Sequence, residues 1–257
     1  MHNVKLKIRS MEIANILDEK VCNSVAAIPC FNNARFIGDI VERSLKHVNR
    51  VVVIDDGSTD NTSRIAEQHG AYVIHHSSNK GYGAAIKSCF NFAKTCNAAA
   101  LVILDGDGQH NPDNIPEILA PIVNGNADMV IGSRFIRQLN PIPTYRKFGI
   151  GVISFLWNIG SKTTVSDTQS GFRAYNRKLI NSLSINEKGM CVSIEILENA
   201  RLIGAVIKEV PASCHYDRAT FGRKAIKHGV DVALFVIRIR LKNRLSKLRQ
   251  HWQILDK

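Results

Sequence analysis

Short runs of β-branched and other apolar residues alternate with segments of helical spacing along most of this chain. The run Val51-Val52-Val53-Ile54, for example, lies between two stretches of helical pattern. Such alternation implies an α/β fold with a mostly parallel central sheet and helices on both faces. We expect strands near residues 25–28, 51–54, 72–74, 100–104, 129–131 and 205–210, and helices near residues 34–47, 60–69, 84–95, 115–123, 148–159 and 195–202.

Two acidic clusters follow directly on expected strands. Asp55-Asp56 comes after the second strand, and Asp105-Gly106-Asp107 comes after the fourth. Ligands of open α/β sheets bind beyond the carboxyl ends of the parallel strands. Both clusters are therefore candidate binding residues, with a solvated acidic turn as the structural alternative.

Asp105 and Asp107 place two carboxylates one residue apart at the end of a uniformly apolar run. Their charges repel, and Gly106 between them allows a turn in which both point at one spot. A hard divalent cation offsets this repulsion, and a diphosphate can fill its remaining coordination positions. All-oxygen ligation favours Mg²⁺ or Mn²⁺ over zinc. Gln109 could add an amide oxygen, and His110 either a nitrogen or a supporting contact.

Asp55 and Asp56 suit a different task. A carboxylate at a strand end can accept hydrogen bonds from a nucleobase N–H or from ribose hydroxyls. The neighbouring Ser58 and Thr59 could instead be plain turn and cap residues, and Asp60 is a natural helix cap.

The formal net charge of +12 favours anionic partners such as nucleic acid, phosphate ligands or a membrane surface. Much of the excess follows Phe221. No helix-turn-helix, RNA-binding or zinc-finger pattern is present, and acidic strand ends repel nucleic-acid phosphates, so we expect no nucleic-acid partner. The sequence shows neither a secretory signal nor an apolar run of about 18–20 residues, so we expect a cytoplasmic location.

Several motifs in fixed order resemble the inverting glycosyltransferase family 2, nearest the dolichyl-phosphate mannose synthase and polyprenyl-phosphate sugar transferase branch. The similarity covers about residues 25–229. It is carried by Val53-Ile54-Asp55-Asp56-Gly57-Ser58-Thr59-Asp60-Asn61-Thr62, Asn79-Lys80-Gly81-Tyr82-Gly83-Ala84-Ala85, Asp105-Gly106-Asp107-Gly108-Gln109-His110-Asn111-Pro112, Gly132-Ser133-Arg134, Ser170-Gly171-Phe172-Arg173 and Glu209-Val210-Pro211.

This resemblance implies a GT-A type fold, in which a nucleotide-binding α/β sheet carries a D-x-D metal site. It implies that Asp105, Asp107 and Gln109 hold Mg²⁺ or Mn²⁺ on the diphosphate of a UDP- or GDP-linked sugar. The donor nucleotide would lie against Pro29, Phe31, Asp55, Asp56 and Gly106.

For the acceptor, the resemblance implies that Arg134 meets a phosphate group and that Arg146 is a second phosphate contact. Arg218 resembles an arginine on a loop that closes over the donor, which makes Asp105, Asp107, Arg134 and Arg218 the expected catalytic set. The sequence departs from the family pattern at three places. Asn33 stands where an acidic residue is usual, and Ile150 where a serine is usual. Gly222-Arg223-Lys224-Ala225 stands where the loop motif G-x-S-K is usual.

Inversion needs a nucleophile in line with the departing diphosphate. A hydroxyl acceptor would need a general base, for which Asp167 and Glu195 are candidates, with a loop cap and an exposed helix residue as their structural alternatives. A lipid monophosphate is already anionic near neutral pH and could attack without a base. Arg173 could bind phosphate or form an internal salt bridge.

We divide the chain into a peripheral N-terminal extension (residues 1–20), the catalytic domain (21–229) and a basic amphipathic helix (230–257). In the last segment, apolar residues recur every three or four positions, and basic residues lie largely elsewhere on the helix. Such a helix can lie in the interface of a membrane, here its cytoplasmic face, or pack on the catalytic domain or on a second subunit. The apolar positions are Ala233, Leu234, Ile237, Leu241, Leu245, Leu248 and Trp252.

The sequence therefore predicts a metal-dependent inverting transferase that moves GlcNAc, glucose or mannose from a nucleotide sugar to a dolichyl or polyprenyl phosphate. One alternative is a family member that glycosylates a saccharide hydroxyl. Another is a catalytically silent nucleotide-sugar binder. Association into a homo-oligomer is compatible with each.

Overall fold

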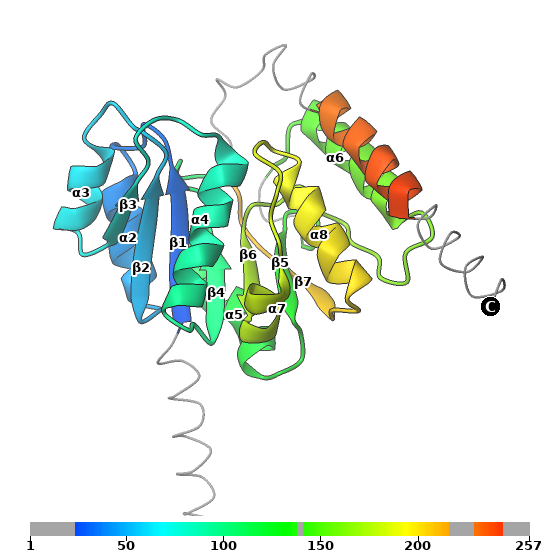
Figure 1. The fold of residues 1–257 in the computed structure, drawn as a ribbon, viewed down its shortest axis with the longest axis horizontal. Coiled ribbons are helices and arrows are strands. Elements are labelled where there is room, and N and C mark those ends of the chain that lie inside the picture. The colour runs from blue at the N-terminus through cyan, green and yellow to red at the C-terminus, as the bar shows by residue number, and fades with distance from the viewer. Residues whose placement is uncertain (1–23, 138–140, 216–228, 244–257) are drawn as a thin grey trace, which may run out of the picture.

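The computed structural model describes residues 24–137, 141–215 and 229–243. A seven-stranded sheet in the order β3-β2-β1-β4-β6-β5-β7 forms its centre (Figure 1). The strands are β1 (Ser24–Cys30), β2 (Arg50–Asp55), β3 (Tyr72–His75), β4 (Ala100–Ile103), β5 (Met129–Ser133), β6 (Arg173–Asn176) and β7 (Ile207–Pro211).

All neighbouring strands are parallel except at β6, which runs antiparallel to both β4 and β5. The sequence pattern did not predict β6, because Arg173-Ala174-Tyr175-Asn176 contains no apolar run and begins with a charge. It also did not predict the short helix that follows, α7 (Arg177–Ser182). The expected mostly parallel α/β sheet is confirmed, with one reversed strand.

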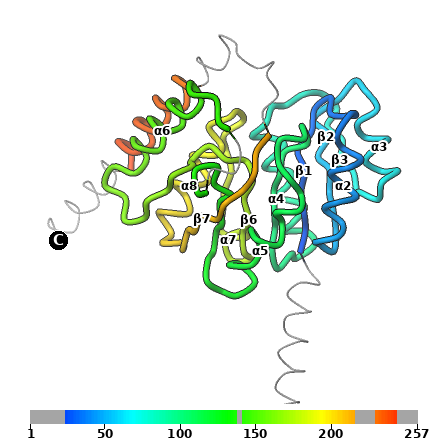
Figure 2. Tube along the Cα trace, turned by 180° about the vertical axis from the view of Figure 1, so that it is seen from behind, coloured from blue at the N-terminus to red at the C-terminus, as the bar shows by residue number. Residues whose placement is uncertain are grey.

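The helices cover both faces of the sheet (Figures 1 and 2). Most match the expected segments, although α6 and α8 begin several residues earlier than their apolar patterns indicated. They are α2 (Ile37–Leu45), α3 (Thr62–Gln68), α4 (Tyr82–Thr95), the 3-10 turn η1 (Pro112–Asn114), α5 (Ile115–Val123), α6 (Thr144–Asn158), α7 and α8 (Val192–Leu202). Residues 229–243 form a further helix, orange to red in Figure 1, beside α6.

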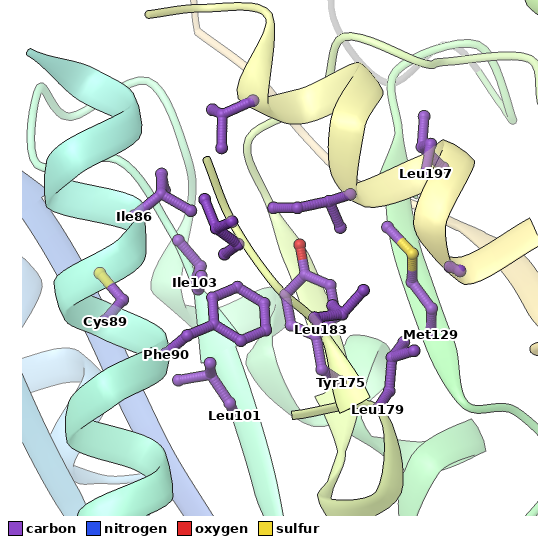
Figure 3. Packing of buried hydrophobic residues seen from close by; sticks show 14 of the residues in the cluster. Ile86, Cys89, Phe90, Leu101, Ile103, Met129, Tyr175, Leu179, Leu183 and Leu197 are labelled. Carbon is purple, nitrogen blue, oxygen red and sulfur yellow. The ribbon is translucent and has the colours of Figure 1, made fainter. Parts of the chain in front are cut away.

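Two apolar clusters, one on each face, anchor these layers. Figure 3 shows part of the cluster beneath α4, α7 and α8, where Phe90 meets Tyr175 edge to face at 4.8 Å between ring centroids. The same cluster includes Val232 and Val236 of the 229–243 helix, so the inner face of that helix is part of the core.

The parallel register brings the two acidic clusters to one edge of the sheet. Cys30 at the end of β1 pairs with Asp55 at the end of β2, and Ala27 pairs with Ile103 at the end of β4. The chain segments that follow β1, β2 and β4 therefore emerge side by side, where an open α/β sheet binds its ligands.

Candidate active site

A cavity of about 370 Å³ opens at this carboxyl edge of the sheet. Asp56, from the turn after β2, and the Asp105–Asp107 turn after β4 both contribute to its wall. The predicted residues that line it are Pro29, Phe31, Asp56, Asp105, Gly106 and Asp107. The residues expected around the donor and its metal thus line a single cavity, with the exception of Asp55 and Gln109.

Asp105 sits directly after Leu104, which is fully buried. Its carboxylate accepts a hydrogen bond from the Tyr82 hydroxyl at 3.1 Å. Burial raises the pKa of Asp105, although the hydrogen bond from Tyr82 and the charges of Arg134 and Arg173 act in the opposite direction. Tyr82 belongs to one of the family motifs, but the sequence alone predicted no role for it. The structure has it at the start of α4 and in the cavity wall, where its hydroxyl supports Asp105.

Asp107 is the second carboxylate of the pair, and it accepts the backbone N–H of Gln109 at 3.0 Å. Burial and then the charge of Asp105 raise the pKa of Asp107. The charge of Asp105 therefore adds to the cost of ionising Asp107, as expected for two neighbouring carboxylates.

The donor set of this pair fits a hard divalent cation, because both groups supply oxygen and both face the same cavity. Within the described residues, no three His, Cys, Asp or Glu side chains converge on a common metal position. The Gln109 amide oxygen lies 4.0 Å from the Cys214 sulfur, and Gln109 does not line the cavity. Asp105 and Asp107 are thus the residues that would hold a divalent cation in this cavity.

His110 supports the turn rather than pairing ionically with Asp105. The backbone N–H of Asp105 donates to His110 Nδ1 at 3.1 Å, so this nitrogen carries no proton. Burial lowers the pKa of His110 to about 4, which agrees with a neutral ring at neutral pH. The 3.6 Å separation of this nitrogen from the Asp105 carboxylate is therefore not a salt bridge.

Two glycines allow the turn to pack this closely. A Cβ at Gly106 would lie 2.3 Å from the Cys30 sulfur, and a Cβ at Gly171 would lie 2.5 Å from the Asp105 carboxylate. Any larger residue at Gly171 would displace Asp105. This explains the glycine of the Ser170-Gly171-Phe172-Arg173 motif in structural terms.

The carboxylates of the other acidic cluster are fully engaged within the protein. Asp55 accepts hydrogen bonds from Ser58, Ser63 and His75. Burial favours its protonated form, but these hydrogen bonds together lower the pKa of Asp55. Asp55 thus stabilises the turn after β2 through hydrogen bonds and does not line the cavity.

Asp56 does line the cavity, and its orientation is fixed by three donors. His76 approaches to 2.6 Å, and the backbone N–H groups of Lys80 and Gly81 donate at 2.9 and 2.8 Å. His76 is itself buried and contacts the Ser88 hydroxyl at 2.9 Å. The sequence pattern gave His76 no role, since a lone histidine after a strand carries no distinctive signal.

The segment around Phe31 forms the part of the cavity wall where the family resemblance implies a nucleotide. Asn32 adopts a left-handed backbone, with φ of 55°, and its amide oxygen accepts the N–H of Thr59. The Asn33 side chain accepts the N–H of Phe31 at 3.0 Å. The Phe31 ring is left 45% exposed at the cavity wall, where a flat base could stack on it.

Arg134 lies beyond the end of β5 in a buried ion pair with Asp167. Its Nε and Nη2 atoms donate to the two Asp167 oxygens, each at 2.7 Å. Glu209 in β7 accepts the N–H groups of Ser166 and Asp167, at 2.8 and 2.9 Å, and so fixes the loop that presents Asp167. Asp167 is fully buried, so its carboxylate orients Arg134 and is not accessible to an acceptor.

Glu195, the other candidate base, is buried rather than exposed. It accepts the backbone N–H groups of Asn186 and Glu187 at 3.0–3.1 Å. This loop reaches the start of α4, where Gly83 donates to the carbonyl of Lys188 at 2.9 Å. Glu195 therefore caps the loop preceding α8.

Arg173 forms neither of the interactions expected for it. Its guanidinium donates to the carbonyls of Ser170, Ser193 and Thr168 at 2.7–2.9 Å, within the core. The expected internal salt bridge was wrong, because Arg173 donates to backbone carbonyl oxygens and not to a carboxylate. Arg173 ties the Gly171 turn to the start of α8.

The remaining predicted residues lie away from these contacts or outside the described chain. Arg146, in the first turn of α6, donates to the Tyr145 hydroxyl at 3.2 Å and does not line the cavity. Ile150 is buried on the inner face of α6. Arg218 and Lys224 lie outside the described residues.

Comparison with known proteins identifies the family. Residues 25–184, more than half of the chain, match the model of glycosyl transferase family 2. The chain belongs to this family.

Relatives of this family 2 glycosyltransferase include enzymes named for lipid-phosphate acceptors. The UDP-N-acetylglucosamine–dolichyl-phosphate N-acetylglucosaminyltransferase of Methanococcus voltae is 29% identical over 76% of this chain and 87% of the relative. The polyprenol monophosphomannose synthase of Mycolicibacterium smegmatis is 28% identical over 73% of this chain and 76% of the relative.

The expected GT-A type fold is confirmed by likeness to solved structures. Glucosyl-3-phosphoglycerate synthase from Mycobacterium tuberculosis, crystallised with Mn²⁺, UDP-glucose and phosphoglyceric acid, superimposes with a TM-score of 0.64. The match covers 87% of this chain and 82% of that protein at 16% identity, which speaks for the fold alone. Among the described residues of our transferase, no helix is long and apolar enough to span a bilayer.

Tyr82→Phe should weaken metal binding by the transferase without unfolding it. The change removes the hydroxyl that donates to Asp105, and loss of such a supporting hydrogen bond typically costs about 10- to 100-fold in metal affinity. Calorimetric titration with Mn²⁺ in the presence of a nucleoside diphosphate measures the effect. Tyr72→Phe, at an exposed position on β3, is the matched control, and equal affinities of the two variants would contradict the role of Tyr82.

Mn²⁺ affinity of the transferase should fall on acidification at a higher pH than ordinary aspartates would allow. The pKa values of Asp105 and Asp107 are raised by burial, so protons displace the cation as pH falls through these raised values. Titrations between about pH 8 and about pH 4 follow the loss. Affinity that stays constant down to the usual aspartate range, near about pH 4, would show that the pair titrates normally.

Proposed function

We propose that this protein transfers a sugar from a nucleoside diphosphate to a dolichyl or polyprenyl phosphate, with inversion at the anomeric carbon. Its relatives named for such acceptors span most of the chain. The cavity supports the proposal with an acidic pair suited to a donor diphosphate and a nucleotide side lined by Pro29, Phe31 and Asp56. UDP- and GDP-linked GlcNAc, glucose and mannose are the candidate donors.

The observation that carries the acceptor assignment is the engagement of both candidate bases. Asp167 is held by Arg134, and Glu195 by the backbone of residues 186–187. The carboxylates that line the cavity among the described residues are Asp56, already bonded to three donors, and the metal-binding pair. A site without an accessible base favours a nucleophile that is already ionised, and a phosphate monoester is one.

In the proposed reaction, an acceptor phosphate oxygen forms a bond to the anomeric carbon while the bond from that carbon to the diphosphate breaks. The nucleoside diphosphate departs with the bonding electron pair, and no proton transfer is required. Bound Mg²⁺ or Mn²⁺ would stabilise the negative charge that develops on the leaving diphosphate. Asp105 and Asp107 would hold the cation, and Tyr82 would orient Asp105.

Arg134 is the proposed acceptor clamp. Its charge is near enough to Asp105 to act against the raised pKa of that carboxyl, although Arg134 does not itself line the cavity. Asp167 and Glu209 hold it in one orientation. A preorganised arginine binds phosphate with little further loss of side-chain entropy. Arg146 and Arg218 are proposed as additional phosphate contacts on the acceptor and donor sides.

We further propose that the protein works at the cytoplasmic face of a membrane, where a lipid-linked acceptor is presented, and that residues 230–257 take part in this attachment. The exposed side chains of the 229–243 helix support that assignment. Self-association into a homo-oligomer remains a prediction of the sequence.

The defining experiment supplies radiolabelled nucleotide sugars, Mn²⁺ and a polyprenyl phosphate to the purified full chain. Label extracted into organic solvent identifies a lipid-linked product, and a panel of UDP- and GDP-sugars identifies the donor. Label that appears only in water-soluble saccharide would assign the chain to transfer onto a hydroxyl. Binding of nucleotide sugar without any transfer would make it a silent binder.

Replacing both Asp105 and Asp107 by Asn should abolish this transfer. The change removes the charges that hold the cation while preserving side-chain size, so the fold should persist and melting temperature should not fall. Glu67→Gln combined with Glu117→Gln removes two exposed charges elsewhere and serves as the control. Full turnover by the double Asn variant, or by the unaltered chain in excess chelator, would refute metal-dependent transfer.

Arg134→Lys should raise the KM for the acceptor phosphate by about tenfold or more and leave the KM for the donor nearly unchanged. Lysine keeps the charge but loses the planar fork that binds both Asp167 and phosphate. Arg177→Lys, at an arginine that donates to backbone carbonyls on the opposite edge of the sheet, is the control. An equal rise in both KM values would assign Arg134 a purely structural role.

A further inference from the structure

The outer surface of α6 and the 229–243 helix is unusually apolar. On α6 and at its C-cap, Phe148, Val152, Phe155 and Ile159 recur at steps of four, three and four residues. On the second helix, Val230, Leu234, Ile237 and Leu241 recur at the same steps. These eight side chains, which we call the outer stripes, are between 39% and 75% exposed and are eight of the fourteen large apolar side chains exposed in the described chain.

The two stripes lie on neighbouring helices. Figures 1 and 2 show the pair adjacent from opposite sides. Arg240 of the second helix donates to the carbonyl of Ile159 at the end of α6. The inner faces, which include Trp157 and Val236, belong to the same core cluster, so both outer stripes point away from it.

The charges around these stripes are almost all positive. Of the basic residues, Lys147, Lys162, Arg238 and Lys242 are exposed. Residues 141–165 and 229–243 contain a single carboxylate, Asp231, against six basic residues: Arg146, Lys147, Lys162, Arg238, Lys242 and Arg240, the last of which pairs with Glu198 of α8. An apolar surface bordered by cations suits an anionic lipid headgroup layer above a hydrocarbon interior.

We infer that the outer stripes of α6 and the 229–243 helix together form a docking face for an anionic lipid membrane. The inference rests on the proposed function for its purpose, since a lipid-linked phosphate must be collected from a bilayer. It goes beyond the sequence prediction, which assigned membrane contact to residues 230–257 alone and gave α6 no part in it. Leu234, Ile237 and Leu241, which that prediction placed on the apolar face, are indeed exposed.

The first test measures sedimentation of the full chain with vesicles of phosphatidylcholine and phosphatidylglycerol. Phe155→Ser combined with Leu234→Ser removes one large side chain from each stripe and should reduce the vesicle partition coefficient at least tenfold. Ile203→Ser combined with Val206→Ser alters two exposed apolar residues elsewhere and should leave it unchanged. Circular dichroism melting verifies that each variant is folded. If the Phe155→Ser, Leu234→Ser variant is unfolded, Phe148→Ser alone replaces it in the sedimentation test.

The second test addresses charge. Arg238→Glu combined with Lys242→Glu should weaken sedimentation with the anionic vesicles and leave the weaker association with pure phosphatidylcholine unchanged. Added salt should reduce the difference between the unaltered chain and this variant, because screening weakens surface electrostatics. Equal sedimentation of the unaltered chain and both stripe and charge variants would overturn the inference.

A second copy of the chain is the competing occupant of this face. Light scattering that shows a dimer for the unaltered chain and a monomer for the Phe155→Ser, Leu234→Ser variant, without vesicle binding by either, would overturn the lipid assignment in favour of self-association.

Activity with two acceptors separates this inference from the proposed function. With a short, water-soluble prenyl phosphate, the stripe variant should turn over as fast as the unaltered chain. With polyprenyl phosphate embedded in anionic vesicles, it should be at least tenfold slower. If the unaltered chain glycosylates neither acceptor but still sediments through the stripes, the proposed reaction fails and the docking face stands. Transfer to vesicle-embedded acceptor that is unaffected in the variant overturns the docking face and leaves the reaction intact.

Discussion

The repulsion between Asp105 and Asp107 is the constraint on which the rest of the site depends. Both groups lie against a buried strand end, where desolvation raises both pKa values and the charge of Asp105 raises that of Asp107 further. Arg134 and Arg173 offset this only at a distance, because each guanidinium is committed to other partners. A cation placed between the two carboxylates relieves the repulsion directly, and a diphosphate can then bind to that cation.

The other carboxylates near the cavity show what is distinctive about this pair. Asp56, Asp167, Glu195 and Glu209 each accept backbone N–H groups and hold loops in place. Among the described residues, the hydrogen-bond donors to the pair are the Tyr82 hydroxyl and the Gln109 N–H. Carboxylates that accept several protein donors hold the walls of the cavity in place. Asp105 and Asp107, with one such donor each, keep the most acceptor sites for a ligand.

Much of the fold and the centre of the site could be predicted from the sequence, for identifiable reasons. Buried parallel strands such as Val51–Ile54 produce uninterrupted apolar runs, and polar residues directly after such runs must lie at the carboxyl edge. Residues 55–56 and 105–107 were therefore predictable as neighbours at that edge, although Asp55 does not line the cavity, whereas Pro29 and Phe31 were expected only from the family resemblance. Strand β6 was not, because its order arises from pairing with β4 and β5 rather than from its own pattern.

The roles that depend on side-chain direction also could not be predicted from the sequence. Nothing in the motif around Arg173 distinguishes a phosphate contact from an arginine that binds three carbonyls, since both require the same residue. Asp167 and Glu195 raise the same difficulty: a carboxylate near a site can be a base or a cap, and only its partners decide. Tyr82 and His76 were overlooked because they act through Asp105 and Asp56 rather than on a ligand.

The 229–243 helix shows why periodicity alone gives an incomplete account of a surface. Its apolar residues occupy two faces, one containing Val232 and Val236 in the core and the other containing Leu234 and Leu241 in solvent. A helix that packed only on the protein would need just the first face, and exposed leucines on the second would lower solubility without benefit. The matching stripe on α6, at the same spacing and on the adjoining helix, means that the exposed apolar surface is shared by two segments far apart in sequence. A single surface built from two separate segments is more simply explained by one extended apolar partner than by chance exposure on each helix.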